Sequence, residues 1–193
     1  LHCRGLMCLL NFKNYNIDFN MKDVDIRLEQ LTVDHDLANY VEMVNDKENT
    51  HSIEGIDNEI MKEEDLKDFI RNYNGVLYGI FNENNIHVGN LGFNRFEEKL
   101  KRCNTGILLS KKYQGHGYAF KAFIIGLNDI FNNYDINKVE LFVVKTNFPA
   151  IKLYESLGFE LKGLVKDQFY KNGIYEDSLA YSISKQDFIN HHY

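Results

Sequence analysis

Two stretches of the chain decide its fold and its expected chemistry: Gln114-Gly115-His116-Gly117-Tyr118-Ala119 and, further along, Asn147-Phe148-Pro149-Ala150-Ile151-Lys152-Leu153-Tyr154 with Gly158-Phe159. The first follows an apolar run and leads into a helical pattern, so its two glycines lie in a loop between a strand and a helix. Such a loop exposes successive backbone N–H groups beside the positive end of the helix, where anions bind. Neither the Walker pattern nor the dinucleotide pattern Gly-x-Gly-x-x-Gly fits, because the latter fails at Phe120. The sequence predicts a phosphate-binding loop of another kind.

Hydrophobic periodicity places both stretches between regular elements. After the loop, apolar residues recur at helical spacing over 120–131, which predicts an amphipathic helix. In the second stretch Pro149 begins a helix and Gly158 ends it. Further helical patterns cover 37–44 and 62–70, whereas residues 46–60 show no clear period and fit an irregular or loosely helical connection.

Strand patterns surround these helices and complete an α+β domain. Short runs rich in apolar and β-branched residues predict the strands 24–29, 76–81, 86–93, 105–109, 138–144, 159–169 and 174–183. Asn172-Gly173 between the last two runs is a strong signal for a β-hairpin. The order β-α-α-β-β-β-α-β-α-β-β predicts a central mixed β-sheet flanked by helices, with a C-terminal β-hairpin.

Length and composition fit a single domain. A chain of 193 residues with 44% hydrophobic and 13% aromatic residues can bury one core but is short for two. Residues 1–21 lack periodicity, so we expect a flexible N-terminal extension there and the domain in residues 22–193. The apolar run Leu6–Leu10 is much shorter than the roughly 20 residues of a membrane span, so no membrane partner is expected.

Charge and cysteine content disfavour other partners. The chain has 22 basic and 28 acidic residues, a net charge of −6, so it offers no basic face for nucleic acid and suits a cationic partner better. Its three cysteines, Cys3, Cys8 and Cys103, are odd in number and lack metal-ligand spacing. Reduced thiols are therefore expected, in a cytoplasmic protein without a metal cofactor.

The two opening stretches resemble the acyl-CoA site of the GNAT superfamily of N-acetyltransferases. The pattern Gln/Arg-x-x-Gly-x-Gly/Ala of that superfamily matches Gln114, Gly117 and Ala119. Its signature Asn-x-x-Ala-x-x-x-Tyr-x-x-x-Gly-Phe matches Asn147, Ala150, Tyr154, Gly158 and Phe159. Residues 163–177 are similar to the last hairpin of the branch that holds spermidine acetyltransferases and ribosomal-protein N-terminal acetyltransferases. The resemblance covers 104–183 well and 24–190 loosely.

The resemblance implies acetyl-CoA as co-substrate and assigns residues to it. The pyrophosphate would lie on the loop of Gln114, Gly115, His116, Gly117, Tyr118 and Ala119, and the pantetheine arm would pair with the backbone of Ile107, Leu108 and Leu109. Asn147 would contact the same arm. Tyr154 lies one helical turn beyond Ala150, on the same face, and would protonate the departing thiolate. From spacing alone Tyr154 also fits an ordinary core aromatic, and the side chain of His116 is expected to point to solvent.

One position departs from the pattern. Many relatives carry a glutamate early in the strand before the loop, where it deprotonates the amine through water; this chain has Asn104 there. A neutral amide cannot take up the proton. Glu97, Glu98 and His87 are alternatives from neighbouring strands, or water and backbone carbonyls suffice for an amine that arrives unprotonated.

The expected activity is direct transfer of an acetyl group from acetyl-CoA to a primary amine, with a small cationic amine such as a polyamine as acceptor. The alternatives are an N-terminal acetyltransferase of a protein such as a ribosomal protein, and a non-catalytic CoA-binding sensor module. Carboxylates within 51–59 could attract a cationic amine, although a solvated acidic loop fits equally. Oligomers are common in this branch, so the resemblance implies that the aromatic-rich C-terminal hairpin could form a homo-oligomer interface.

Overall fold

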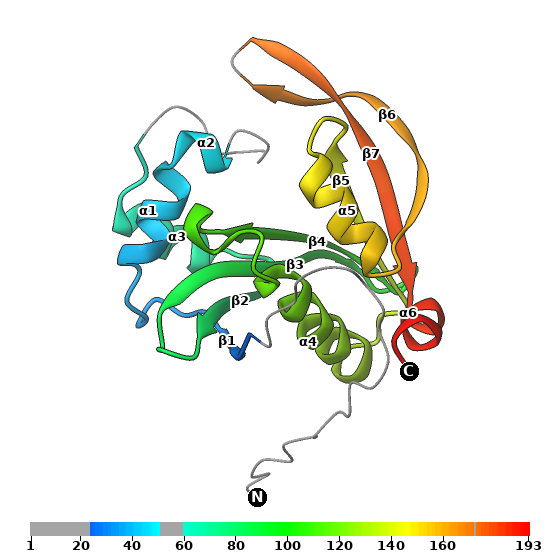
Figure 1. Cartoon of the computed structure of the whole chain (residues 1–193), viewed down its shortest axis with the longest axis horizontal. Helices are drawn as coiled ribbons and strands as arrows, with labels where there is room; N and C mark the ends of the chain where they lie inside the picture. The colour runs from blue at the N-terminus through cyan, green and yellow to red at the C-terminus, as the bar shows by residue number, and fades with distance from the viewer. Residues whose placement is uncertain (1–23, 51–59, 172) are drawn as a thin grey trace, which may run out of the picture.

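The fold is known from a computed structural model, which describes residues 24–50, 60–171 and 173–193 (Figure 1). The predicted N-terminal extension 1–21 and the acidic residues 51–59 lie outside this part of the chain. The strands are β1 (Ile26–Gln30), β2 (Gly75–Asn82), β3 (His87–Glu97), β4 (Arg102–Leu109), β5 (Lys138–Val144), β6 (Glu160–Lys171) and β7 (Ile174–Ser184). The helices are α1 (Ala38–Asn45), α2 (Lys47–Thr50), α3 (Glu63–Arg71), the 3₁₀ turn η1 (Lys111–Tyr113), α4 (Tyr118–Asn133), α5 (Phe148–Ser156) and α6 (Lys185–His192).

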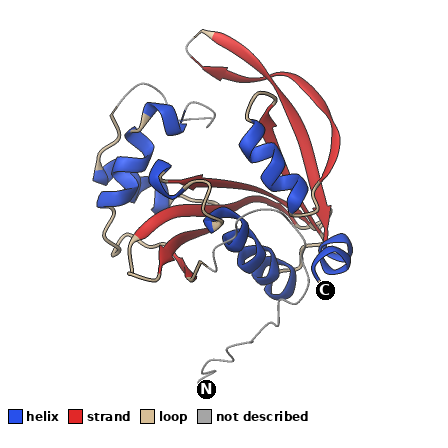
Figure 2. Cartoon of the chain, viewed as in Figure 1, coloured by secondary structure: helices blue, strands red, loops and turns tan. Residues whose placement is uncertain are grey.

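The strands form one mixed sheet in the order β1-β2-β3-β4-β5-β7-β6. Among the described strands the only parallel pair is β4 with β5, because α4 carries the chain from the end of one strand back to the start of the other. The remaining neighbours are antiparallel, and β2–β3 and β6–β7 are hairpins. The predicted α+β fold, a central mixed sheet flanked by helices with a C-terminal hairpin, is confirmed (Figure 2).

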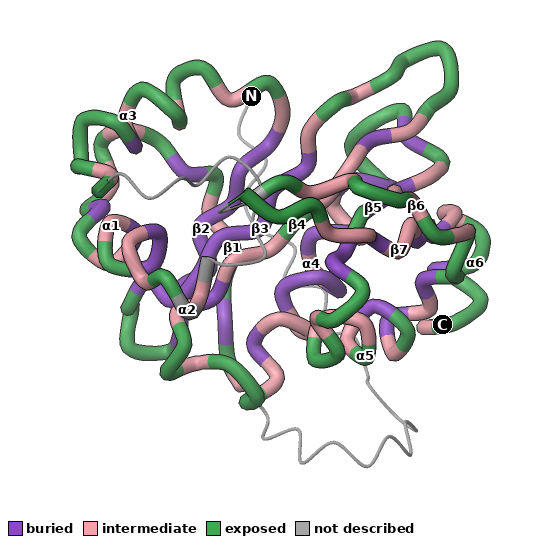
Figure 3. The backbone as a smooth tube through the Cα atoms, turned by 90° about the horizontal axis from the view of Figure 1, so that it is seen from above, coloured by how far each residue is buried: buried purple, intermediate pink, exposed green. Residues whose placement is uncertain are grey.

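Helices cover both faces of the sheet, and the two faces have separate cores. The larger core joins the sheet to α4 and α5, and the smaller core joins it to α1 and α3. Alternate strand residues divide between them: in β4, Ile107 and Leu109 pack in the larger core and Leu108 in the smaller. Buried backbone therefore runs along the central strands and the inner sides of the helices (Figure 3).

The helix α6, which follows β7, was not predicted. The hydroxyl of Ser184 accepts a hydrogen bond from the backbone N–H of Asp187 (3.1 Å) and so caps the helix. Phe188 is buried and packs against Phe131 of α4, with ring centroids 5.7 Å apart. This aromatic anchor fixes the last helix under the larger core.

Candidate active site

The central feature of the site is an open seam between β4 and β5. The two strands pair only over Arg102–Asn104 and Lys138–Glu140, although each runs several residues further. β4 then keeps its pairing with β3 up to Leu109, and β5 keeps its pairing with β7 up to Val144. Within the described part of the chain, no strand pairs with the facing edges of 105–109 and 141–144. The seam thus presents main-chain N–H and C=O groups to any extended ligand that enters it.

The predicted phosphate loop closes the wide end of this seam. Gly115 and Gly117 have φ of 75° and 88°, a left-handed conformation that other residues adopt only at a cost. The first backbone hydrogen bond of α4 runs from Lys121 N–H to the carbonyl of Gly117 (3.1 Å). Among the described residues, none accepts a hydrogen bond from the backbone N–H groups of 115–120. These groups and the start of the long helix α4 form a cradle for an anion.

A small amide network holds the loop against the end of β4. Gln114 Nε2 donates to Asn49 Oδ1 (2.6 Å) and to the carbonyl of Leu109 (3.1 Å). Asn49, from α2, also donates from Nδ2 to the carbonyl of Leu109 (2.8 Å). The side chain of Gln114 therefore orders the loop in this structure and joins it to α2.

The other loop residues divide between core and surface. Tyr118 is buried and packs edge-on against Tyr113, with ring centroids 5.6 Å apart, and burial raises the pKa of its phenol. His116 is exposed, as expected for a residue between the two glycines. Tyr118 and His116 therefore contribute to the cradle through their backbone N–H groups and not through their side chains.

The second stretch contributes Asn147 and Tyr154 from α5. Asn147 Oδ1 accepts a hydrogen bond from the N–H of Ala150 (3.3 Å), so this side chain caps the helix beside the seam. Tyr154 is 6% exposed and packs edge-on against Phe123 and Phe159, with centroid distances of 5.7 and 5.8 Å. Burial raises the pKa of its phenol to about 12, so the hydroxyl is protonated at neutral pH. The phenol can therefore donate a proton from a largely dry environment.

The alternative proton acceptors lie in three different environments. His87 is buried, with its Nε2 2.9 Å from Asn90 Oδ1, and burial lowers its pKa. Glu97 forms an ion pair with Arg102 (2.8 Å), and Glu98 is exposed in the turn after β3.

A carboxylate that the sequence analysis missed is the register neighbour of Asn104. Glu140 lies opposite Asn104 on β5 and forms ion pairs with Lys138 (2.7 Å) and Arg102 (3.3 Å). Asn104 and Glu140 are the last pair before the seam opens. No local signal identifies this neighbour, because the register between β4 and β5 is set across a helical crossover.

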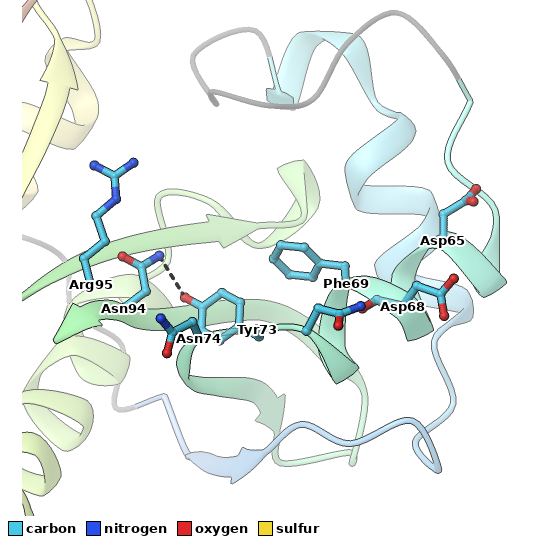
Figure 4. Close-up of a pocket in the computed structure, with 8 residues that line it drawn as sticks. Asp65, Asp68, Phe69, Tyr73, Asn74, Asn94 and Arg95 are labelled. Carbon is cyan, nitrogen blue, oxygen red and sulfur yellow. Dashed lines mark hydrogen bonds between the residues drawn. The ribbon is translucent and has the colours of Figure 1, made fainter.

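A cleft of about 530 Å³ lies between α3 and the end of β3 (Figure 4). Its walls come from Asp65, Asp68, Phe69, Tyr73, Asn94 and Arg95. Asn94 Nδ2 donates a hydrogen bond to the hydroxyl oxygen of Tyr73 (3.3 Å), and Asn94 is the register partner of Asn104 on β4. The sequence pointed to carboxylates within 51–59 for the acceptor, which lie outside the described residues, and did not predict this cleft, although Phe69 and Tyr73 lie four residues apart at the end of a predicted helix.

Two further findings concern only the described ranges, 24–50, 60–171 and 173–193. No group of three or more His, Cys, Asp or Glu side chains is arranged there to hold a metal ion. No helix in these ranges has the length and apolar character needed to cross a membrane.

The fold and the site define the class of protein. Residues 25–160 match the acetyltransferase (GNAT) domain, and the chain belongs to this family. It is 30% identical over 92 residues to the spermidine N(1)-acetyltransferase of Escherichia coli strain K12, a match that covers 48% of this chain and 50% of that enzyme. The chain thus spans about half the length of the curated relatives that it matches.

Solved structures show the same fold. The spermidine N-acetyltransferase from Vibrio cholerae in complex with CoA and spermine has a TM-score of 0.77 at 20% identity, covering 86% of this chain and 98% of that one. A ribosomal-protein alpha-N-acetyltransferase in complex with coenzyme A has a TM-score of 0.76 at 19% identity, covering 86% and 97%. The resemblance predicted from the two opening stretches is confirmed for the family and the fold, and the predicted acyltransferase class agrees with these relatives.

Proposed function

We propose that this chain is an acetyl-CoA-dependent N-acetyltransferase that transfers the acetyl group directly to a primary amine. The observation that carries the proposal is the open seam between β4 and β5, which ends at a loop whose backbone N–H groups have no hydrogen-bond acceptor among the described residues. An acyl-CoA needs these two features together, an extended edge for its pantetheine arm and an anion cradle for its pyrophosphate. Residues 107–109 supply the edge and residues 114–119 the cradle.

Tyr154 acts in this proposal on the leaving sulfur. The uncharged amine attacks the thioester carbonyl carbon, a C–N bond forms, and the C–S bond breaks with its electron pair going to sulfur. The nitrogen loses one proton to water, the Tyr154 hydroxyl gives its proton to the sulfur, and the phenolate regains a proton from water. The products are an amide and a free thiol. Because burial raises the pKa of the phenol to about 12, its proton is in place at neutral pH when the C–S bond breaks.

For the acceptor we propose a small cationic amine such as a polyamine. The net charge of −6 favours a cation, and a matched relative is a spermidine acetyltransferase. The cleft beside Asn104 adds Asp65, Asp68 and the aromatic rings of Phe69 and Tyr73, a combination that suits an ammonium group. A protein N-terminus is the second candidate, supported by the fold shared with the ribosomal-protein enzyme.

The decisive experiment measures thiol release from acetyl-CoA with a panel of polyamines, aminosugars and peptides. Release that depends on a polyamine supports the proposal as stated. Release only with peptides carrying a free N-terminus replaces the acceptor but keeps the enzyme. Tight CoA binding with no release for any amine would show a non-catalytic CoA-binding module, which the neutral side chain of Asn104 also allows.

The first testable consequence concerns the loop. We expect Gly117→Val to weaken CoA binding by about tenfold or more, because a β-branched residue at φ 88° is strained by roughly 1–2 kcal/mol and shifts the N–H groups. His116→Ala changes only an exposed side chain of the same loop and should leave the CoA affinity unchanged. Calorimetric titration of both variants with CoA checks this. Equal affinities in the two variants would contradict the predicted cradle.

A second consequence concerns Cys103, the only cysteine within the described residues. Its side chain is fully buried, and burial raises the pKa of its thiol to about 12, so it does not act as a nucleophile. We expect Cys103→Ala to keep kcat within about twofold, since direct transfer needs no acetyl-cysteine. Initial rates over both substrates should give intersecting lines. Parallel lines, together with loss of activity in the variant, would show a covalent intermediate.

A further inference from the structure

Two glycines lie side by side in the centre of the sheet, where side chains normally pack. Gly92 of β3 and Gly106 of β4 are register partners, so their missing side chains would point to the same face. A methyl group at Gly92 would meet Tyr73 and Leu77, which belong to the smaller core beneath α1 and α3. The pair therefore forms a small flat floor on the face opposite α4.

No described residue fills the space above Gly106. Within the described part of the chain, nothing lies within 4 Å of the position that a methyl group would occupy. The backbone of Gly106 is not left-handed, so the fold does not require glycine there. Glycine in a strand interior is destabilising relative to alanine, and it often marks a place where a ligand approaches closely.

The hydroxyl of Tyr73 stands at the edge of the same floor. A methyl group at Gly92 would lie 2.2 Å from Tyr73 Oη, so the hydroxyl occupies the space over Gly92. The phenol is held there by Asn94 Nδ2, which donates to it (3.3 Å), and by the ring of Phe69 at 5.4 Å (Figure 4). With one accepted hydrogen bond, Oη keeps a lone pair and its own proton for a ligand.

The floor lies at the closed end of the seam. Gly106 follows Asn104, the last residue that pairs with β5, and precedes Ile107, where the proposed pantetheine edge begins. An acyl group at the end of a pantetheine arm in the seam would reach this point. The cleft lined by Phe69, Tyr73 and Asn94 shares Tyr73 with this floor, because the Tyr73 hydroxyl lies over Gly92.

We propose that Gly106 is the floor of the acceptor site and that the reacting amine lies over it with one N–H donated to Tyr73 Oη. The inference rests on the proposed N-acetyltransferase function. It adds where the acceptor amine binds and which side chain positions it. The rest of a polyamine would extend into the cleft past the ring of Phe69. Tyr73 is then a residue that positions the amine by direct contact and takes no proton itself.

The chemistry of Tyr73 agrees with this role. Burial raises the pKa of its phenol, so the hydroxyl is neutral at neutral pH and accepts a hydrogen bond without becoming a base. The carboxylates nearest to the cleft are already engaged: Asp68 pairs with Arg71 (2.6 Å), and Asp65 accepts from the backbone N–H of Lys62 (2.7 Å). The amine proton would therefore leave through water, as a site with Asn104 in place of a glutamate requires.

Gly106→Ala tests the floor directly. We expect kcat/KM for spermidine to fall by about tenfold or more, because one additional methyl group in a fitted site is worth 10- to 200-fold. Melting temperature should stay level or rise, since the methyl group meets no atom of the described residues, and CoA affinity should stay within about twofold. Gly163→Ala is the matched control. Gly163 also lies in a strand, no described atom is within 4 Å of the position of an added methyl group, and its strand β6 pairs with β7 and does not border the seam.

Tyr73→Phe tests the holding group. Loss of one hydrogen bond should raise KM for spermidine by about tenfold with KM for acetyl-CoA unchanged. A merely structural role would lower stability or change both KM values together. Tyr134→Phe, a half-exposed tyrosine at the end of α4, should leave all these values unchanged.

Calorimetric titration of spermidine into the CoA-loaded protein separates this inference from the proposed function. If wild-type protein binds spermidine and Gly106→Ala does not, the acceptor site is placed even where turnover is absent, and only the proposed activity fails. Wild-type affinity and turnover in Gly106→Ala would overturn the inference while leaving the acetyltransferase intact. Loss of CoA binding in Gly106→Ala would also overturn it, because the space would then belong to the donor.

Discussion

Tyr154→Phe is expected to lower kcat for acetyl transfer by about 10²- to 10⁴-fold, the usual contribution of a positioned proton donor. Burial of the Tyr154 side chain on α5 raises the pKa of its phenol and keeps the hydroxyl protonated. The variant removes only the hydroxyl oxygen. Because no described residue forms a hydrogen bond with that oxygen, CoA affinity and stability should change little. Single-turnover rates with saturating acetyl-CoA and amine measure the loss.

Tyr40→Phe supplies the control, because Tyr40 is equally buried but lies in the smaller core on α1. Its variant should keep full activity. The pH profile adds a second readout: with a pKa of about 12, Tyr154 remains protonated as pH rises to about 10, so the wild-type rate should climb with amine deprotonation. A wild-type rate in Tyr154→Phe would contradict the catalytic role and leave Tyr154 with only the packing role of a core aromatic residue.

Phe123→Ala is expected to lower the free energy of unfolding by about 3–5 kcal/mol, a large share of the stability of a typical domain. Phe123 is fully buried on α4, and its ring packs edge-on against Tyr154 (5.7 Å) and Phe159 (6.2 Å). The cavity therefore opens between α4 and α5, beside the proposed proton donor. Urea unfolding followed by circular dichroism measures the change.

Phe148→Ala is the comparison for this prediction. Phe148 begins α5 but is 65% exposed, so its loss should change stability by less than about 0.5 kcal/mol. Phe123→Leu, which fills most of the space, should lie between the two. Equal stability of the alanine variants would mean that the junction of α4 and α5 contributes little to folding.

The elements that the sequence predicted are those with local signals. Gly115 and Gly117 mark the loop because left-handed backbone favours glycine, and Asn147 marks the start of α5 because its side chain caps the helix. Apolar spacing over 120–131 marks α4, since one side of that helix is buried. These signals depend on neighbours a few residues apart, so a single sequence carries them.

What the sequence did not reveal depends on residues that are distant in the chain. Glu140 neighbours Asn104 only because β5 returns beside β4 after a long helix, and Tyr73 meets Gly92 only across the packing of α3. The missed helix α6 is different, because Ser184 and Asp187 do form a local capping pair. This capping pair directly follows the alternating pattern of β7, so residues 184–187 were not recognised as the start of a helix.

The open seam also bears on how the protein avoids aggregation. An unpaired strand edge is normally a template for another chain, yet the seam keeps two such edges that face each other within one molecule. The outer strand β6 is guarded differently: its pairing with β7 shifts register twice, and it carries Lys162 and Lys166. The unpaired main-chain groups of the seam are thus accessible to a narrow ligand but not to the edge strand of another molecule.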